Sequence, residues 1–257
     1  MSIGYPNVRK AEGERSELIA RYDQAYARAA ARGASAQVTA LETALAGSWP
    51  VVNMDLEALL AMMLDNEPYS TYRMQVEAGV RGPASGDRDM RRASVDAILF
   101  GTNDRHIRYA ALALGVGGLT SYGAFGVVLR ESAVADRASL LDENAFDFVR
   151  RHEVGPFKDA PEGYVSTWSD RSLLAVAKLA DAVDGTTVEA AFPDLLLWTE
   201  GDRETDRFVE VHIFGSFGRY AVSTVRGTSK GLSPSERAKL MAVEDFLAST
   251  GGAWIDS

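Results

Sequence analysis

Residues 192–215 read FPDLLLWTEGDRETDRFVEVHIFG, in which two apolar runs flank a densely charged turn. Short apolar runs bounded by turn residues are typical of buried strands, so this segment predicts a β-hairpin in the core. The second run carries Glu210 and His212 among large apolar residues. A buried carboxylate and a buried imidazole need either partners or a chemical role. We therefore place the candidate functional site on this strand.

Side chains two residues apart in a strand share a face, so Glu210 and His212 should point the same way, flanked by two phenylalanines. A carboxylate in such surroundings loses hydration and is stabilised by a nearby cation. We expect Arg73 or Arg137 to supply that cation. The simpler alternative is that Glu210 is an internally paired structural residue.

The composition is that of a globular protein, since 46% of the 257 residues are hydrophobic and 25% are charged. The formal net charge of −9 argues against nucleic acid as a partner. The absence of cysteine excludes disulfides, thiolate metal sites and a cysteine nucleophile. Because no signal-like or membrane-length apolar run occurs, we expect a soluble protein without membrane contact. It would be cytoplasmic, or secreted into a target cell without a cleaved signal peptide.

Periodic apolar residues predict helices in the first quarter of the chain, over residues 13–31, 36–46 and 55–64. The third of these carries an apolar stripe made of Leu56, Leu59, Leu60 and Met63. We expect this stripe to lie in the core. The alternative is a docking groove for a partner helix, which would make the protein a non-enzymatic interaction module.

Strands and helices are mixed in the rest of the chain. The pattern predicts strands over residues 72–80, 126–131 and 253–257, a short helix or turn over 91–100, and helices over 170–183 and 233–248. Asp170 would cap the first of these two helices, and Ser233 with Glu236 would form a capping box on the second. We infer an α+β fold, with an N-terminal helical region (residues 1–66) followed by a mixed, mainly antiparallel sheet domain with flanking helices (residues 67–257).

Familiar catalytic signatures are missing from the sequence. The glycine-rich segment at residues 115–123 is neither a dinucleotide fingerprint nor a phosphate loop, and we interpret it as a turn before a strand. The three histidines, His106, His152 and His212, show no ligand spacing, so we predict no metal centre of the zinc type. A serine-hydrolase elbow is also absent.

One alternative gives the hairpin a metal-dependent chemistry. Pro193-Asp194 followed by Glu210-Val211-His212 matches the order of a restriction-like nuclease, in which two carboxylates hold a divalent cation. Histidine stands here where those enzymes have lysine. In this interpretation Asp194 and Glu210 would be the metal ligands.

Several short motifs between residues 67 and 215 occur in a recognisable order. They are NEPYSTYRMQVEAG, an isolated LFG at 99–101, RYAAL, SYGAFG, RASLLDENAF and RFVEVHIFG. In this order they resemble a poorly characterised bacterial group of ADP-ribosyltransferase-like toxins and effectors. The matching positions are Gln75, Glu77, Gly79, Tyr109, Tyr122, Gly123, Arg137, Ser139, Glu210, His212 and Gly215. The segments DENAF and IFG differ from that group's pattern.

The resemblance implies a transferase that consumes NAD. It implies that Glu210 stabilises the ribosyl cation formed when the nicotinamide bond breaks, with His212 and Glu77 as further catalytic residues. It implies NAD contacts from Arg73, Gln75, Tyr109, Tyr122 and Arg137. The basic residues at positions 88–92 are interpreted as a solvated turn or helix end; the alternative, if the protein is an enzyme, is that Arg81, Arg88, Arg91 and Arg92 meet the diphosphate of the cofactor. The partners to expect are a protein acceptor substrate and a cognate inhibitor or chaperone.

Overall fold

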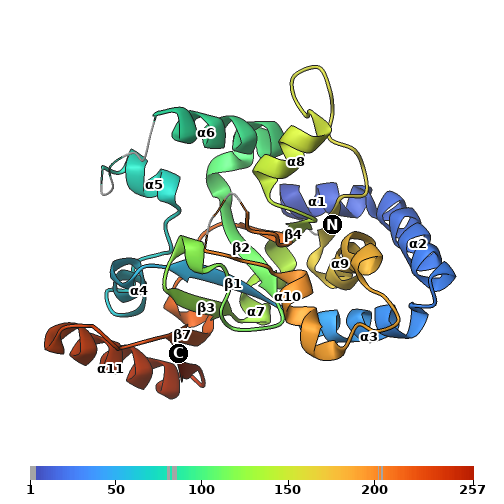
Figure 1. The fold of residues 1–257 in the computed structure, drawn as a ribbon. Helices are drawn as coiled ribbons and strands as arrows, with labels where there is room; N and C mark the ends of the chain where they lie inside the picture. Colours follow the sequence, from blue (N-terminus) through green and yellow to red (C-terminus); the bar gives the residue numbers. More distant parts are fainter. Residues whose placement is uncertain (1–3, 80–81, 83–85, 202, 204) are drawn as a thin grey trace.

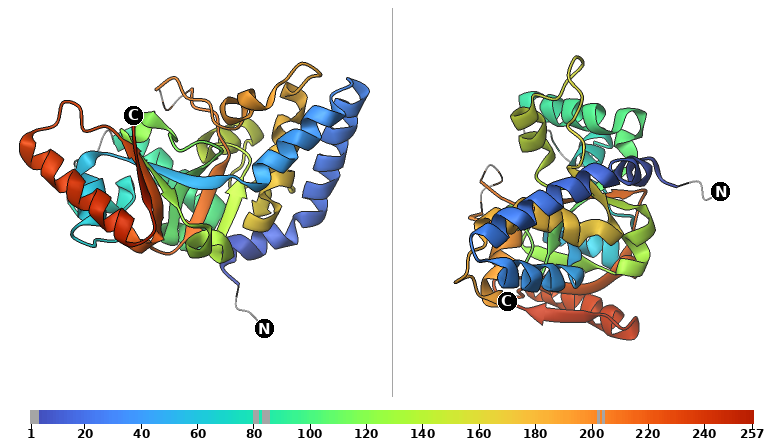
Figure 2. Two further views of the ribbon diagram at one scale, coloured as in Figure 1. Left: turned by 90° about the horizontal axis from the view of Figure 1, so that it is seen from below. Right: turned by 90° about the vertical axis from the view of Figure 1, so that its right-hand side faces the viewer.

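The computed structural model describes residues 4–79, 82, 86–201, 203 and 205–257, with the backbone alone at residues 72 and 86–92 (Figures 1 and 2). These residues form an eight-stranded sheet with the order β5-β4-β6-β2-β1-β3-β7-β8. The strands are β1 Trp49–Met54, β2 Ile107–Ala113, β3 Phe125–Leu129, β4 Ala138–Leu141, β5 Val165–Thr167, β6 Glu210–Phe214, β7 Val222–Gly227 and β8 Ala253–Asp256. Neighbouring strands are antiparallel except for the parallel pair β7 and β8.

Helices cover both faces of this sheet (Figure 1). They are α1 Pro6–Gly13, α2 Arg15–Ala31, α3 Ser35–Ala46, α4 Leu56–Met63, α5 Tyr72–Glu77, α6 Gly86–Phe100, α7 Glu131–Val134, α8 Ala145–His152, α9 Arg171–Leu179, α10 Phe192–Leu196 and α11 Pro234–Ser249. The predicted α+β class, with helices at the N-terminus ahead of the sheet strands, is therefore confirmed. No helix of the described residues is long and apolar enough to cross a membrane.

The predicted N-terminal helices are present as α2, α3 and α4. The Asp55 side chain caps α4 by accepting a hydrogen bond from the Ala58 N–H at 2.9 Å. The apolar stripe of α4 belongs to the core, because Leu59 and Met63 are fully buried. Strand β1, which follows α3 directly, was missed by the sequence-based prediction.

One sheet face carries the main apolar core. Leu112 of β2 and Val211 and Ile213 of β6 belong to the same buried cluster as Leu18 of α2 and Leu174 of α9. Strand alternation explains this arrangement, because every second side chain of a strand lies on the same face. Figure 2 shows α2, α3 and α9 grouped together beside the sheet.

The opposite face carries the polar residues of interest. Tyr109 of β2 lies directly opposite His212 of β6, and Ala111 lies opposite Glu210. Helices α6 and α8 pack over this face through a smaller apolar cluster that includes Val95 and Phe148 (Figure 1). The face that holds the site is thus covered by a different set of helices from the main core.

Two predicted strands are wrong. Residues 72–77 of the expected 72–80 strand form α5, which begins where Thr71 accepts a hydrogen bond from the Met74 N–H at 3.4 Å, whereas residue 80 lies outside the described residues. The first arm of the expected hairpin begins as the short helix α10, with Pro193 in its first turn.

Little of the expected hairpin therefore remains. Trp198 and Arg207 form an isolated antiparallel bridge, and residues 202 and 204 of the charged turn lie outside the described residues. Strand β6 takes its neighbours from elsewhere in the chain, since it lies between β2 and β4.

The remaining predictions are closer to the structure. Residues 91–100 lie within α6, and α9 continues as a 3₁₀ turn to Ala182. Asp170 stands at the N-terminus of α9, but its side chain accepts hydrogen bonds from Arg15 instead of capping the helix. The capping box of Ser233 and Glu236 on α11 and the final strand β8 are confirmed.

Candidate functional site

Glu210 and His212 form a buried pair at the start of β6. Each residue is 3% exposed, and the His212 Nε2 lies 3.3 Å from the Glu210 Oε2. The same oxygen accepts a hydrogen bond of 2.8 Å from the backbone N–H of Ala145, the first residue of α8. The unpaired N–H groups and the dipole of a helix N-terminus both favour a negative charge. The carboxylate is thus held by backbone and imidazole groups.

A small cavity of about 80 Å³ adjoins Glu210. Its walls include the side chains of Tyr69, Tyr109 and Tyr122, together with Asn53 of β1. Aromatic faces attract cations, and a carboxylate stabilises positive charge that develops nearby. The chemistry that suits this cavity is therefore the binding of a small cationic group, and the guanidinium of Arg203 already lies 4.5 Å from the centroid of the Tyr122 ring.

The glycine-rich segment forms one wall of this cavity by closing on Asn53. The Asn53 Nδ2 donates to the carbonyl oxygens of Gly117 at 3.0 Å and Gly123 at 3.2 Å, and the Leu119 N–H donates to the Asn53 Oδ1 at 2.6 Å. Gly118 has φ of +59°, and a Cβ there would lie 2.1 Å from the Asn53 Oδ1. The glycines thus permit close approach to β1, as expected for a turn.

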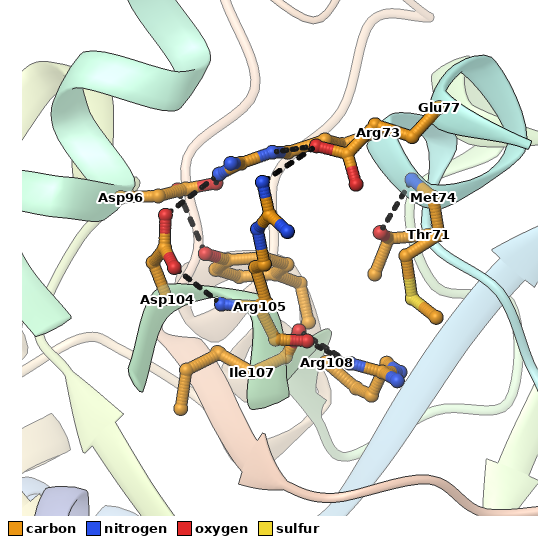
Figure 3. A network of polar contacts seen from close by, with 10 residues as sticks. Thr71, Arg73, Met74, Glu77, Asp96, Asp104, Arg105, Ile107 and Arg108 are labelled. Carbon is orange, nitrogen blue, oxygen red and sulfur yellow. Dashed lines mark hydrogen bonds and ion pairs between the residues drawn. The ribbon is translucent and has the colours of Figure 1, made fainter. Parts of the chain in front are cut away.

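Tyr109 is tied to a buried carboxylate that the sequence did not reveal. Its hydroxyl donates a hydrogen bond of 2.7 Å to the Oδ1 of Asp96, which is 3% exposed. The guanidinium of Arg73 lies 4.0 Å from the Asp96 Oδ2 and donates to Asp104 at 2.9 Å and to Glu77 at 3.0 Å. Figure 3 shows Asp96, Asp104 and Glu77 arranged around Arg73. This network joins α5, α6 and β2.

Aromatic contacts link this network to the Glu210 pair. The His212 ring meets the Tyr109 ring edge to face at 5.6 Å and the Phe100 ring at 4.8 Å between centroids. Edge-to-face contacts at such distances favour one ring orientation. His212 is therefore fixed by its neighbours on β2 and α6 as well as by Glu210.

A second group of titratable residues lies beside the same strands. Burial and the neighbouring Asp142 raise the pKa of Glu143 to about 6, and Glu143 also pairs with Arg151 at 2.7 Å. Burial lowers the pKa of Lys178 to about 8, and its ammonium donates to the carbonyl oxygen of Phe208 at 2.8 Å. Lys178 is thus bonded to the backbone of Phe208, a residue that lines the cavity.

Two of the predicted site residues have local structural partners. The Gln75 side chain donates to the carbonyl oxygen of Ser70 at 3.1 Å. The Arg137 guanidinium donates to the carbonyl oxygens of Phe214 at 2.7 Å and Ser216 at 2.9 Å, and burial lowers its pKa. These contacts fasten the end of β6, so Arg137 is held at the opposite end of this strand from Glu210.

The expected cation for Glu210 is not found where we placed it, since Arg73 pairs with acidic residues and Arg137 with carbonyl groups. Arg81 and the side chains of Arg88, Arg91 and Arg92 lie outside the described residues. Asp194 is exposed on α10 instead of standing on a strand beside Glu210. Within the described part of the chain, no three histidine or acidic side chains gather as a metal centre.

No protein-family model matches the chain, and no curated protein sequence matches it significantly. The function must therefore be inferred from the site.

Sequence reasoning missed three residues of this region, namely Asn53, Tyr69 and Asp96. Asp96 had a recognisable signal, since it stands between apolar residues in a segment expected to be helical. Asn53 had none, because β1 was not predicted. Tyr69 reaches the cavity from a segment outside the named helices and strands, so no local pattern marks it.

Proposed function

We propose that this protein is an ADP-ribosyltransferase-like enzyme that uses NAD as a substrate, with Glu210 as its catalytic carboxylate. The observation that carries the proposal is the cavity in which Glu210 adjoins Tyr69, Tyr109 and Tyr122. Its aromatic and acidic groups complement the nicotinamide ring of NAD, which is a flat cation, and the cavity of about 80 Å³ must widen to take in the ring with its ribose.

The chemistry follows from these groups. The bond between the ribose C1′ and the nicotinamide nitrogen breaks, and nicotinamide leaves with both bonding electrons. The positive charge that develops on the ribose is stabilised by the Glu210 carboxylate. The acceptor nucleophile then forms a bond to C1′ and releases its proton. No redox partner is needed.

The neighbours of Glu210 have supporting roles in this proposal. His212 restricts the carboxylate through the contact of 3.3 Å. Tyr109 and Tyr122 supply aromatic surface for the nicotinamide ring, as the resemblance implied. Arg73 is engaged by acidic side chains, so we assign it the support of Asp96 and, through Asp96, of Tyr109. Glu77, whose side chain is 45% exposed, belongs to the same support.

The direct test is NAD cleavage by the purified protein. We expect release of nicotinamide, measured by chromatography, and a fall of about 100-fold or more in Glu210→Gln, as is typical when a group that stabilises transition-state charge is removed. The matched control is Glu244→Gln, on the exposed side of α11, which should cleave NAD like the wild type. NAD should also raise the unfolding temperature of the wild type by mass action.

Two results would count against the proposal. One is a folded wild type that neither cleaves NAD nor gains thermal stability from it. The other is a Glu210→Gln variant that folds and cleaves NAD as fast as the wild type.

The biological setting belongs to the proposal as well. An enzyme of effector type would modify a protein acceptor and would be restrained by a cognate inhibitor or chaperone. We expect expression in bacteria or yeast to slow growth and Glu210→Gln to relieve the effect. Equal growth defects from the wild type and from Glu210→Gln would show that the toxicity does not depend on catalysis by Glu210.

A further inference from the structure

A second cavity, of about 220 Å³, is lined in part by His212, which also contacts Tyr109 and Glu210. It is enclosed by α1, the end of α6 and strands β2, β4, β5 and β6. The lining used below consists of Asn7, Lys10, Phe100, Ser139, Leu141 and His212. The two cavities have no lining residue in common.

The polar end of this second cavity is built around Asn7, which is 7% exposed. Its Nδ2 lies within hydrogen-bond distance of the Arg137 carbonyl at 3.2 Å, the His212 carbonyl at 3.0 Å and the Ser139 hydroxyl at 3.0 Å. Because two of these acceptors are carbonyl groups, which cannot donate, the orientation of the amide is fixed. The amide oxygen Oδ1 is buried without a partner among the described residues.

An unsatisfied buried acceptor is costly, so the Asn7 Oδ1 suits a ligand that brings an N–H or O–H donor. The Ser139 hydroxyl next to it accepts from Asn7 and retains its own proton for a second partner. A hydroxyl group on the ligand can satisfy both residues, since a hydroxyl both donates and accepts.

The other walls are mostly apolar, with one positively charged side chain among them. Phe100 and Leu141 supply apolar surface, with the His212 ring beside them. Lys10 lines the cavity and is exposed to solvent. A negatively charged group on the ligand complements Lys10.

We propose that this cavity binds a small aromatic carboxylate that carries a hydroxyl group. The hydroxyl meets Asn7 and Ser139, the ring lies between the apolar walls, and the carboxylate meets Lys10. A volume of about 220 Å³ equals that of roughly seven liquid water molecules, which is enough for one substituted ring.

A ligand bound in this cavity would affect the proposed catalytic site through His212. The His212 ring lines the second cavity, and its Nε2 contacts Glu210. A ligand in this cavity therefore lies against the residue that positions the Glu210 carboxylate. This effect on catalysis rests on the proposed function, whereas binding itself does not.

Binding is tested on the full chain without NAD, by titration calorimetry and thermal unfolding with 4-hydroxybenzoate as the probe. Benzoate, which lacks the hydroxyl, and phenol, which lacks the carboxylate, are the comparison compounds. We expect each to bind about tenfold more weakly, the change typical of one lost polar contact of this kind. The Lys10→Gln variant should bind 4-hydroxybenzoate about as weakly as the wild type binds phenol. The control variant Lys239→Gln, exposed on α11, should bind 4-hydroxybenzoate like the wild type.

A second variant blocks the cavity itself. Val165→Phe, on the β5 wall, should abolish binding of 4-hydroxybenzoate. If this variant fails to fold, Lys10→Gln decides, because an exposed side chain tolerates substitution.

The proposal is overturned if the folded wild type shows neither heat nor stabilisation with the probe. It is equally overturned if Lys10→Gln or a folded Val165→Phe binds as tightly as the wild type, since the probe would then lie elsewhere. Because these measurements contain no NAD, a protein that binds the probe but does not cleave NAD refutes the proposed function alone.

Discussion

At the scale of single residues, the cavity beside Glu210 depends on the groups that hold Tyr109 in place. Tyr109 can line the cavity at a fixed position because its hydroxyl is bonded to a carboxylate inside the protein. Arg73 in turn stabilises the Asp96 carboxylate, and it also forms ion pairs with Asp104 and Glu77. The buried Asp96 carboxylate, which accepts the hydrogen bond from the Tyr109 hydroxyl, therefore fixes the position of the Tyr109 ring in the cavity wall.

The substitution Asp96→Asn tests this role of Asp96. We expect NAD turnover to fall about tenfold and the free energy of unfolding to fall by about 1–3 kcal/mol, because a charge-assisted buried hydrogen bond is weakened. The readouts are steady-state NAD cleavage, with kcat and KM determined separately, and urea unfolding. Asp104→Asn, which touches Arg73 but not the Tyr109 hydroxyl, is the control and should change turnover less.

A double variant makes the test specific. If Asp96 acts through Tyr109, then Asp96→Asn should have no further effect on turnover in a Tyr109→Phe background. Additive losses in the double variant would show that Asp96 acts by another route.

At the scale of elements, much of the architecture was readable from local signals. Helices α2, α3, α4 and α11 follow apolar periodicity and capping residues, and the shared face of Glu210 and His212 follows strand alternation. The errors occurred where local signals conflict. Residues 72–77 alternate bulky and polar side chains like a strand, but the Thr71 cap starts a helix there.

Two central strands gave weak signals for physical reasons. Strand β1 has the sequence WPVVNM, only six residues long, with a proline that is rare inside central strands. Strand β2 has the sequence IRYAALA, in which alanines dilute the β-branched content. Both strands are stabilised by their partners on either side, which no single segment reveals.

The glycine-rich loop at residues 115–123 gives a prediction at this scale. Gly118→Ala should lower the free energy of unfolding by about 1–3 kcal/mol, because a side chain at positive φ is strained and would also displace Asn53. Gly115→Ala, where nothing lies within 4 Å of the added carbon, is the matched control. Denaturant unfolding of both variants decides the matter, and equal stabilities would contradict the packing argument.

At the scale of the whole molecule, the buried charges make stability depend on pH. The pKa of Glu143 is raised from 4.5 to about 6, so the folded state holds a proton that the unfolded state has lost between these values. Stability should therefore fall as pH rises from about 4.5 to 6, by at most about 2 kcal/mol from this group. Its contribution is most favourable below that window.

The substitution Glu143→Gln removes this titration. Urea unfolding between pH 4 and 7 should show that the wild type loses stability relative to the variant as pH rises through the window. Glu244→Gln, exposed on α11, should leave the pH dependence unchanged. A wild type and a Glu143→Gln variant with parallel pH profiles would refute the assignment to Glu143.

The position of β6 in the sheet has a consequence for how the chain is made. Strand β1 pairs with both β2 and β3, and β4 pairs with β5, but in the described sheet only β6 joins these two groups. During translation these five strands are synthesised before residue 210, so the edges of β2 and β4 that β6 will occupy are unpaired until β6 is made. Glu210 lies on β6, the strand that pairs with both of these edges. A chain that stops short of β6 therefore lacks both the carboxylate proposed for catalysis and the strand that joins its two half-sheets.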